Sequence, residues 1–335
     1  MKKHSLVGRI FLFAFICVVA VSAAEAKGKK FGLFVGINAY SDGINPLKGC
    51  VNDATKMQEA MVTKFGFNKA DTTLLTDGAA TRAAIIAGLQ KYQTLAGPGD
   101  LLVFHYSGHG TLWPDGYSEE KDETKQIFLQ VPNDEGKMEV LYERGTYDSA
   151  IVPVDANSYS SGKAWGNLIL DDELYAIFSA VTRKGAQVVL ISDSCHSGSI
   201  DRANPEFQKR EVPLVKIFGV KEYNDLKLKK PSKMRKRTLP PAKGLYITMT
   251  GSRDDEFSLD ATIRGTPMGL FTATLLQTLP TSANLLKAMT YESLMAQVSQ
   301  AVSAQASKWD SNQNPQLNFT YGNPKAPIFS VPGAR

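Results

Sequence analysis

Four short, predominantly apolar runs constrain the fold of this 335-residue chain more than any other feature. Each ends at small or polar residues and suits a strand that is buried on both faces. Segments with apolar residues at helical spacing lie between these runs. This alternation predicts an α/β fold with a mainly parallel central sheet covered by helices on both faces. The runs are FGLFVGI (31–37), LLVFHY (101–106), QVVLIS (187–192) and GLYITMTG (244–251).

The intervening segments carry recognisable helix starts and stops. Thr81 suits an N-cap, Gly66 and Gly185 suit helix terminators, and Pro267 suits a first helical turn. The stretch 111–149, with the turn sequences WPDG and PNDEG, has the character of an insertion. The spacing predicts helices over 51–65, 81–93, 171–185, 267–279 and 291–309, and further strands over 71–77, 126–131 and 149–155.

The first 26 residues have the pattern of a secretory signal peptide. A basic head, MKKHSLVGR, precedes the apolar stretch IFLFAFICVVAVSAA and the small-residue sequence AEA. This pattern predicts cleavage that leaves Lys27 near the mature start. The alternative is an uncleaved N-terminal anchor, which is the one reading that would hold the protein at a membrane. Both readings predict a secreted or periplasmic location.

Cysteine content and charge argue against two classes of protein, a disulfide-stabilised scaffold and a nucleic-acid-binding protein. After removal of Cys17 with the signal, Cys50 and Cys195 remain, too few for a secreted disulfide scaffold, so we expect free thiols. The net charge of +5 depends on LKLKKPSKMRKR (226–237), which has seven basic residues and no acidic ones. A single basic run is typical of a solvated loop, and nucleic-acid binding would need a basic surface, so we expect no nucleic-acid partner.

Two of the predicted strands end in reactive residues. LLVFHY leads into Ser107-Gly108-His109-Gly110, and QVVLIS leads into DSCHSG (193–198). Functional groups of parallel sheets collect beyond the carboxyl ends of the strands. If the two strands are neighbours, the His109 imidazole can accept the Cys195 proton and activate the thiol. The backbone N–H groups of Gly110 and Cys195 would then suit an oxyanion hole.

Simpler readings of these residues remain open. Cys195 alone could be a small buried apolar residue, and His109 alone a hydrogen-bonded turn residue. A metal site is a further alternative, although ligand spacings such as CxxC or HExxH are absent from the sequence. Its candidate ligands are Cys50, His105, His109, Cys195 and His196.

The two turns resemble the paired motifs of the metacaspases, which are caspase-like cysteine peptidases. YSGHG (106–110) and DSCHSG resemble the histidine and cysteine motifs. The resemblance covers roughly residues 30–320 and implies a caspase-like sandwich, with His109 as proton shuttle and Cys195 as nucleophile. It also implies cleavage of protein or peptide substrates after Arg or Lys. Further matching segments are FVGINAY (34–40), LKGCVNDA (47–54), IVPVDA (151–156), LDDEL (170–174), MTGSRDDEFSLD (249–260), GLFTATLLQTL (269–279) and NPQL (314–317).

The same resemblance implies an acidic pocket for the basic side chain of the substrate. Asp53 and Asp193 match the pocket carboxylates of the family, with Cys50 and Ser107 at the rim. Two partly desolvated carboxylates pair well with a guanidinium or ammonium group. Taken without the family, Asp53 could be a helix N-cap and Asp193 a turn residue.

Calcium is the one cofactor that the resemblance implies, and no organic cofactor is expected. Asp155, Asp171 and Asp172 match calcium carboxylates of the family. The fourth usually lies seven residues after the cysteine, where this chain has Arg202, and Asp201 comes one residue early. Calcium takes six to eight oxygen ligands, so the displacement would weaken the site. Asp171 and Asp172 could equally cap a helix.

We therefore expect one caspase-like domain over residues 27–335. It divides into a large-subunit-like part (30–202), a basic linker (203–243) and a small-subunit-like part (244–325). The exposed basic run of this linker predicts self-processing within 227–237. Two alternatives remain, namely a non-catalytic caspase-like module that binds basic peptides or partner proteins, and a legumain-like or gingipain-like peptidase.

Overall fold

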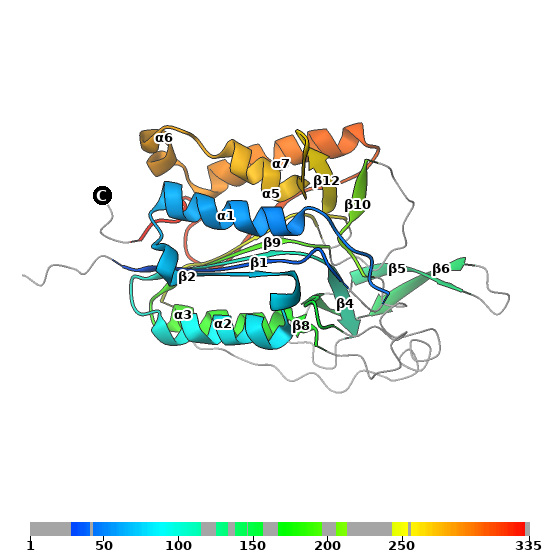
Figure 1. The fold of residues 1–335 in the computed structure, drawn as a ribbon, viewed down its shortest axis with the longest axis horizontal. Coiled ribbons are helices and arrows are strands. Elements are labelled where there is room, and N and C mark those ends of the chain that lie inside the picture. The colour runs from blue at the N-terminus through cyan, green and yellow to red at the C-terminus, as the bar shows by residue number, and fades with distance from the viewer. Residues whose placement is uncertain are drawn as a thin grey trace, which may run out of the picture.

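The structure is a computed structural model in which a central sheet lies between two layers of helices (Figure 1). The expected signal peptide (1–26), self-processing run (227–237) and residues His196, Asp201 and Arg202 lie outside the residues described. These are residues 28–40, 43–114, 125–132, 138–145, 147–156, 167–195, 206–212, 243–253 and 256–331.

The central sheet has six strands in the order β14-β11-β9-β3-β1-β2. Its neighbouring pairs are parallel except β11 and β14, so the mainly parallel sheet is confirmed. Strands β3 and β9 are neighbours, with Ser107 opposite Asp193. Their two reactive turns therefore leave the same edge of the sheet. The strands are β1 Lys30–Gly36, β2 Thr72–Thr76, β3 Leu101–Ser107, β9 Gln187–Asp193, β11 Tyr246–Thr250 and β14 Gln316–Tyr321.

Helices cover both faces of this sheet, as the sequence predicts. Helices α1, α5 and α7 lie on one face, and α2 and α3 lie on the other (Figure 1). The Thr81 hydroxyl accepts a hydrogen bond from Ala84 N–H and caps α2, and Gly66 ends α1 in the left-handed region at φ 69°. The helices are α1 Cys50–Phe65, α2 Arg82–Leu95, α3 Asp171–Arg183, α5 Leu270–Thr278, α6 Ala283–Ala288 and α7 Tyr291–Lys308.

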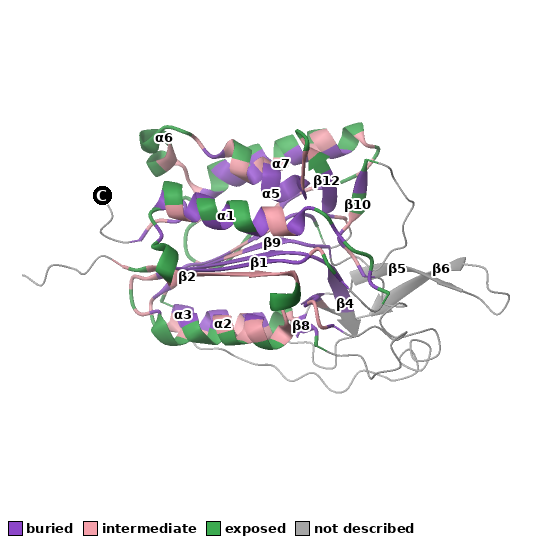
Figure 2. Cartoon of the chain, in the orientation of Figure 1, coloured by how far each residue is buried: buried purple, intermediate pink, exposed green. Residues whose placement is uncertain are grey.

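The central strands are buried because each contributes side chains to two apolar cores. In β1, Leu33 and Val35 pack with α2 and α3, and Phe34 packs with α1, α5 and α7. Figure 2 shows the resulting buried band along the sheet and the helix surfaces that face it. Burial on both faces explains why these strands read as continuous apolar runs.

One predicted boundary is wrong. The helix expected to begin at Pro267 begins at Leu270, and Thr266–Gly269 form strand β13, which pairs with β12 (Leu259–Ile263). Arg264 and Gly265 join these strands with φ values of 50° and 80°, which suits a tight hairpin turn. Proline is tolerated in an edge strand as it is in a first helical turn, so Pro267 alone could not separate the two.

Within the described residues, three small sheets accompany the central one. Their strand orders are β10-β12-β13, β4-β7-β8 and β5-β6. The strand predicted over 126–131 corresponds to β5, and the strand predicted over 149–155 overlaps β7 but ends earlier, at Ile151. Short 3₁₀ helices at Lys69–Asp71 and Asp77–Ala79 flank β2. The remaining bounds are β4 Gly110–Pro114, β5 Lys125–Pro132, β6 Met138–Gly145, β7 Tyr147–Ile151, β8 Ile169–Leu170 and β10 Phe207–Lys209.

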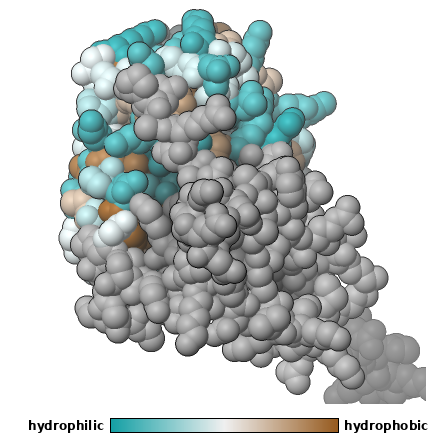
Figure 3. Space-filling view, turned by 90° about the vertical axis from the view of Figure 1, so that its right-hand side faces the viewer, coloured by the Kyte–Doolittle hydropathy of each residue, from teal (hydrophilic) through white to brown (hydrophobic). Residues whose placement is uncertain are grey.

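The helices and the visible surface can be compared with what a membrane-spanning segment requires. Among the residues described, every helix is too short or too polar to cross a bilayer. On the face seen in Figure 3, the part with assigned hydropathy is mainly hydrophilic, with small apolar areas.

We expect Gly36→Ala to destabilise the fold, because α1 crosses β1 very closely there. A Cβ atom at Gly36 would lie 2.3 Å from the Cys50 carbonyl oxygen and 2.9 Å from the Ala54 Cβ. Overpacking of this kind costs about 1–3 kcal/mol of unfolding free energy. Urea unfolding of Gly36→Ala and of Gly78→Ala, where a Cβ would meet open space, measures the difference. Equal stability of the two variants would contradict the close crossing.

Candidate active site

His109 lies in the turn after β3 with one ring nitrogen fixed. Its Nε2 lies 2.7 Å from the Asn45 carbonyl oxygen, and its ring centre lies 4.7 Å from that of Tyr40 at an interplanar angle of 55°. A carbonyl only accepts hydrogen bonds, so Nε2 carries the hydrogen and Nδ1 keeps a lone pair. Burial lowers the pKa of His109 to about 4, although the Asn45 carbonyl opposes this shift. The imidazole is therefore a neutral base at neutral pH.

Cys195 follows β9 and is completely buried. Its Sγ donates to the Ser258 carbonyl oxygen at 3.3 Å and lies 2.7 Å from the donating Ser258 N–H. Burial raises the pKa of the thiol, and the nearby Glu211 charge raises it further. Within the described part of the chain, Sγ forms no hydrogen bond with His109. Cys195 and Cys50 are both unbridged, as the sequence predicts.

The two turns meet at one backbone carbonyl group. The carbonyl oxygen of Arg210 accepts hydrogen bonds from Gly110 N–H at 3.0 Å and from Cys195 N–H at 3.2 Å. The Arg210 backbone also lies near His109, whose charged form it favours. A peptide carbonyl of the chain itself therefore lies against both reactive residues and both predicted oxyanion donors.

The side chain of Arg210 fills an acidic pocket beside this carbonyl. Three carboxylates and the hydroxyl of Ser107 surround the fully buried guanidinium. The distances are 2.7 Å to Asp53 Oδ2, 2.9 Å to Asp260 Oδ1, 3.2 Å to Asp193 Oδ2 and 2.8 Å to Ser107 Oγ.

Backbone N–H groups hold each carboxylate in place. Gly269 N–H donates to Asp53 at 3.0 Å, and Lys48 N–H donates to Asp260 at 2.7 Å. Asp193 accepts from the N–H and hydroxyl of Thr272 at 3.0 and 2.7 Å. Thr272 lies in the first turn of α5, where the helix dipole favours a negative charge.

The pocket remains acidic even with the arginine inside it. Burial alone would lower the pKa of Arg210, but Asp193, Asp53 and Asp260 raise it well above its usual value. Burial raises the pKa of Asp53 to about 7, and the Arg210 charge limits this rise. Three carboxylates thus face one guanidinium, and Asp53 can take up a proton near neutral pH.

The structure brings most of the predicted site residues together. His109, Gly110 and Cys195 meet at the Arg210 carbonyl, and Asp53, Ser107 and Asp193 line the pocket. Cys50 lies next to the pocket at the start of α1, where burial raises the pKa of its thiol well above its usual value, although Arg210 and Ser107 oppose this shift.

Three residues of the candidate site were not predicted. Asp260 lies within the matched segment MTGSRDDEFSLD, but that sequence gives no sign that its carboxylate faces Asp53. Asn45 acts through its backbone carbonyl, which has no sequence signature. Arg210 lies in the predicted linker. The basic pair that it forms with Lys209 was the one sequence feature that could have indicated a segment able to enter an acidic pocket.

The described calcium candidates do not form a metal site. Asp155 accepts from Arg82 N–H at 2.7 Å, and Asp171 accepts from Ser149 N–H at 3.1 Å and from Asp172 N–H at 2.9 Å. Among the residues described, His, Cys, Asp and Glu side chains form no group of three that could hold a metal ion. The described donors alone therefore do not fit a calcium ion.

The sheet and its two reactive turns define an α/β protein with a cysteine–histidine site at the carboxyl edge of the strands. Residues 29–323 match the caspase domain family, so the chain belongs to this family. Metacaspase-1 of Cryptococcus neoformans is 33% identical over 182 residues, which are 52% of this chain and 33% of the relative. Metacaspase-1 of Meyerozyma guilliermondii is 34% identical over 182 residues, which are 52% of this chain and 37% of the relative. The matches thus span about a third of the length of these relatives.

A solved structure agrees with the fold. Protein GSU0716 from Geobacter sulfurreducens superposes with a TM-score of 0.60 and 24% sequence identity, over 90% of this chain and 99% of that one. The caspase-like α/β fold expected from the sequence is confirmed.

Proposed function

We propose that this protein is a cysteine endopeptidase that cleaves peptide bonds after Arg or Lys. The placement of Arg210 supports this proposal most directly. Its guanidinium lies among three carboxylates, and its carbonyl oxygen accepts from Gly110 N–H and Cys195 N–H. A substrate arginine in the same position would present its scissile carbonyl to Cys195 and His109.

The proposed reaction begins with transfer of the Cys195 proton to Nδ1 of His109. For this step, Sγ must turn away from the Ser258 backbone. The thiolate then attacks the carbonyl carbon, and the N–H groups of Gly110 and Cys195 stabilise the oxyanion. The His109 imidazolium gives its proton to the leaving amine as the C–N bond breaks. Water then hydrolyses the thioester, with His109 as base, and regenerates the thiol.

Reporter peptides that end in Arg, Lys, Asn or Asp test the proposal. We expect Arg and Lys reporters to be hydrolysed and the Cys195→Ala variant to be inactive on all four. Hydrolysis only after Asn would favour a legumain-like peptidase, and hydrolysis only after Asp would overturn the pocket assignment. Activity that survives in Cys195→Ala would overturn the proposed nucleophile.

We expect Gly269→Ala to close the pocket. A Cβ atom at Gly269 would lie 2.2 Å from Asp193 Oδ2 and 2.5 Å from Arg210 Nη1. The variant should lose roughly tenfold or more of kcat/KM on Arg reporters, in keeping with the cost of overpacking. Gly265→Ala serves as the control, because no atom lies near that position, although its φ of 80° adds some strain. Unchanged arginine hydrolysis by Gly269→Ala would contradict the pocket assignment.

The KM for Arg reporters should fall as pH rises above about 7, because a bound guanidinium lowers the pKa of Asp53 below its value in the empty pocket. Burial raises the pKa of Asp53 to about 7 with the arginine bound. Below that pH, Asp53 is protonated and the pocket has one negative charge less, so arginine binds more weakly. Above it, the ionised carboxylate strengthens binding. Asp53→Asn should flatten this pH dependence, and a wild-type KM that does not change across this range would contradict it.

A non-catalytic module that binds basic peptides is the second candidate, because the neutral thiol is buried and bound to Ser258. Titration of thiols in the native protein separates the two candidates. A peptidase should expose a reactive Cys195 whenever its cleft is open. A module should keep this thiol unreactive even when the protein binds basic peptides.

Calcium stimulation is a further proposal that depends on the family resemblance and on Asp201, since the described donors alone do not fit an ion. Reporter hydrolysis with added calcium or a chelator tests it, and Asp201→Asn should abolish any stimulation. Equal rates with calcium and with chelator would overturn it.

We further propose self-processing within 227–237 and a secreted or periplasmic location. Mass spectrometry of purified wild type and Cys195→Ala tests the first, because only wild type should be cut. Cell fractionation and the N-terminal sequence of the recovered protein test the second. A full-length cytoplasmic protein that begins at Met1 would overturn the predicted signal.

A further inference from the structure

Residues Phe207–Val212 lie in the cleft as an extended strand. On one side of the Arg210 carbonyl, β10 pairs antiparallel with β12, and Arg210 N–H donates to the Ser258 carbonyl oxygen at 3.1 Å. On the other side, Val212 N–H donates to the Gly110 carbonyl oxygen at 2.9 Å. Strand addition of this kind binds a peptide through its backbone and leaves its side chains to be recognised by pockets.

We propose that the cleft selects substrates with an aromatic residue three positions before the cleaved Arg and a basic residue directly before it. Trp309 would recognise the aromatic side chain, as it contacts Phe207 here. Phe257 would recognise the basic side chain, as it contacts Lys209 here. This inference rests on the proposed peptidase function. It adds two specificity-determining residues outside the acidic pocket.

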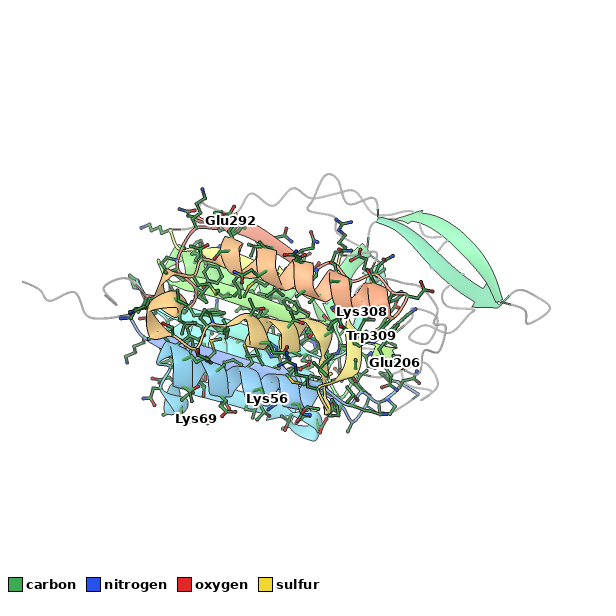
Figure 4. The ribbon with its side chains drawn as sticks, turned by 90° about the horizontal axis from the view of Figure 1, so that it is seen from above. Lys56, Lys69, Glu206, Glu292, Lys308 and Trp309 are labelled. Carbon is green, nitrogen blue, oxygen red and sulfur yellow. The ribbon has the colours of Figure 1, made fainter. Side chains whose placement is uncertain are left out.

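The aromatic position is built from apolar side chains. Phe207 is 8% exposed, and its ring lies 6.1 Å from the Trp309 ring at an interplanar angle of 36°. Leu259 and Ala261 of β12 belong to the same apolar cluster. Figure 4 shows Trp309 at the end of α7, close to Glu206, which precedes β10. An aromatic side chain buried here removes a large apolar area from water.

The basic position uses a cation–π contact. The Lys209 ammonium lies 3.7 Å from the centre of the Phe257 ring. Phe257 also packs against the apolar cluster that contains Phe207, which holds its ring in place. A cation over an aromatic face is attracted by the ring quadrupole, and a neutral side chain would lose this attraction.

The position between these two is a built-in control. Gln208 is exposed and borders an open hollow that Lys48, Thr262 and Pro267 also line. Alternate residues of a strand point to opposite sides, so this side chain faces away from Trp309 and Phe257. We expect substrate selection to be weak at this position.

Four fluorogenic tetrapeptides test the inference. They are Phe-Gln-Lys-Arg and its single alanine replacements at the first three positions. They are assayed with the full chain and with its Arg210→Ala variant, whose own segment should leave the cleft. Loss of Phe should lower kcat/KM roughly tenfold to hundredfold, and loss of Lys roughly three- to tenfold. Loss of Gln should change it less than about twofold. The effects should fall mainly on KM, because ground-state contacts are lost.

Enzyme variants identify the two recognition residues. Trp309→Ala should bring the Phe-to-Ala ratio of kcat/KM close to one while keeping the Lys preference. Phe257→Leu should bring the Lys-to-Ala ratio of kcat/KM close to one while keeping the Phe preference. Trp309→Phe should keep part of the Phe preference. Each ratio is measured within one active variant, so a change in the amount of folded enzyme does not alter it.

The outcomes separate this inference from the function on which it rests. If the four peptides are cut equally, or if both variants keep the wild-type ratios, the two recognition residues are wrong although the peptidase proposal stands. If neither enzyme form hydrolyses an arginine peptide, the peptidase proposal fails and this inference fails with it.

Discussion

Replacing Arg210 with alanine should make the Cys195 thiol react with iodoacetamide about a hundredfold to several thousandfold faster in the uncut chain. The side chain of Arg210 is fully buried and contacts three carboxylates. Removing one partner of a buried ion pair costs about 3–5 kcal/mol, because the remaining charges stay without a partner. Docking of Phe207–Val212 should weaken by that amount, and the opened cleft would expose the thiol.

Intact-mass spectrometry follows the alkylation, and peptide mapping distinguishes Cys195 from the buried Cys50. The matched control is Gln208→Ala, which changes an exposed side chain of the same segment. We expect this control to react at about the wild-type rate, within a factor of roughly two. If Arg210→Ala reacts no faster than the control, the segment does not cover the thiol in solution.

Asp260→Asn should lower kcat/KM for Arg reporters by about a hundredfold or more. Asp260 Oδ1 lies 2.9 Å from the arginine Nη2, and its side chain is almost completely buried. The amide can accept one hydrogen bond, but it supplies no negative charge where solvent screening is weak. The loss should appear mainly as a higher KM, because the ion pair forms when the substrate binds.

Asp310→Asn makes the same chemical change at an exposed turn with a φ of 55°, a conformation that asparagine also tolerates. Its kcat/KM should match that of the wild type. Equal activity of Asp260→Asn and Asp310→Asn would remove Asp260 from the arginine pocket.

The sequence predicted the parts of this protein that depend on local patterns. Strands buried on both faces must be apolar throughout, so β1, β3 and β9 were recognisable, and so were the turns that carry His109 and Cys195. Asp53 and Asp193 came from the family resemblance. The start of α5 was misplaced because Pro267 suits an edge strand as well as a first helical turn.

The remaining site residues depend on contacts between distant parts of the chain. Asp260 contacts the backbone at Lys48, 212 residues away, and no local pattern reports such a contact. The docking of Arg210 likewise follows from the assembled pocket and not from its neighbours in the sequence. Asn45 contributes a carbonyl group, which every residue has.

The distance along the chain between the walls of the pocket has a consequence for the order of folding. The segment around Arg210 is synthesised before β12, and the anchor between Lys48 and Asp260 closes a loop of 212 residues. Closing so long a loop costs entropy that only the finished pocket offsets. The Cys195 thiol should therefore be exposed in the nascent chain as it leaves the ribosome. It should become buried only after the C-terminal third of the chain has folded against the rest.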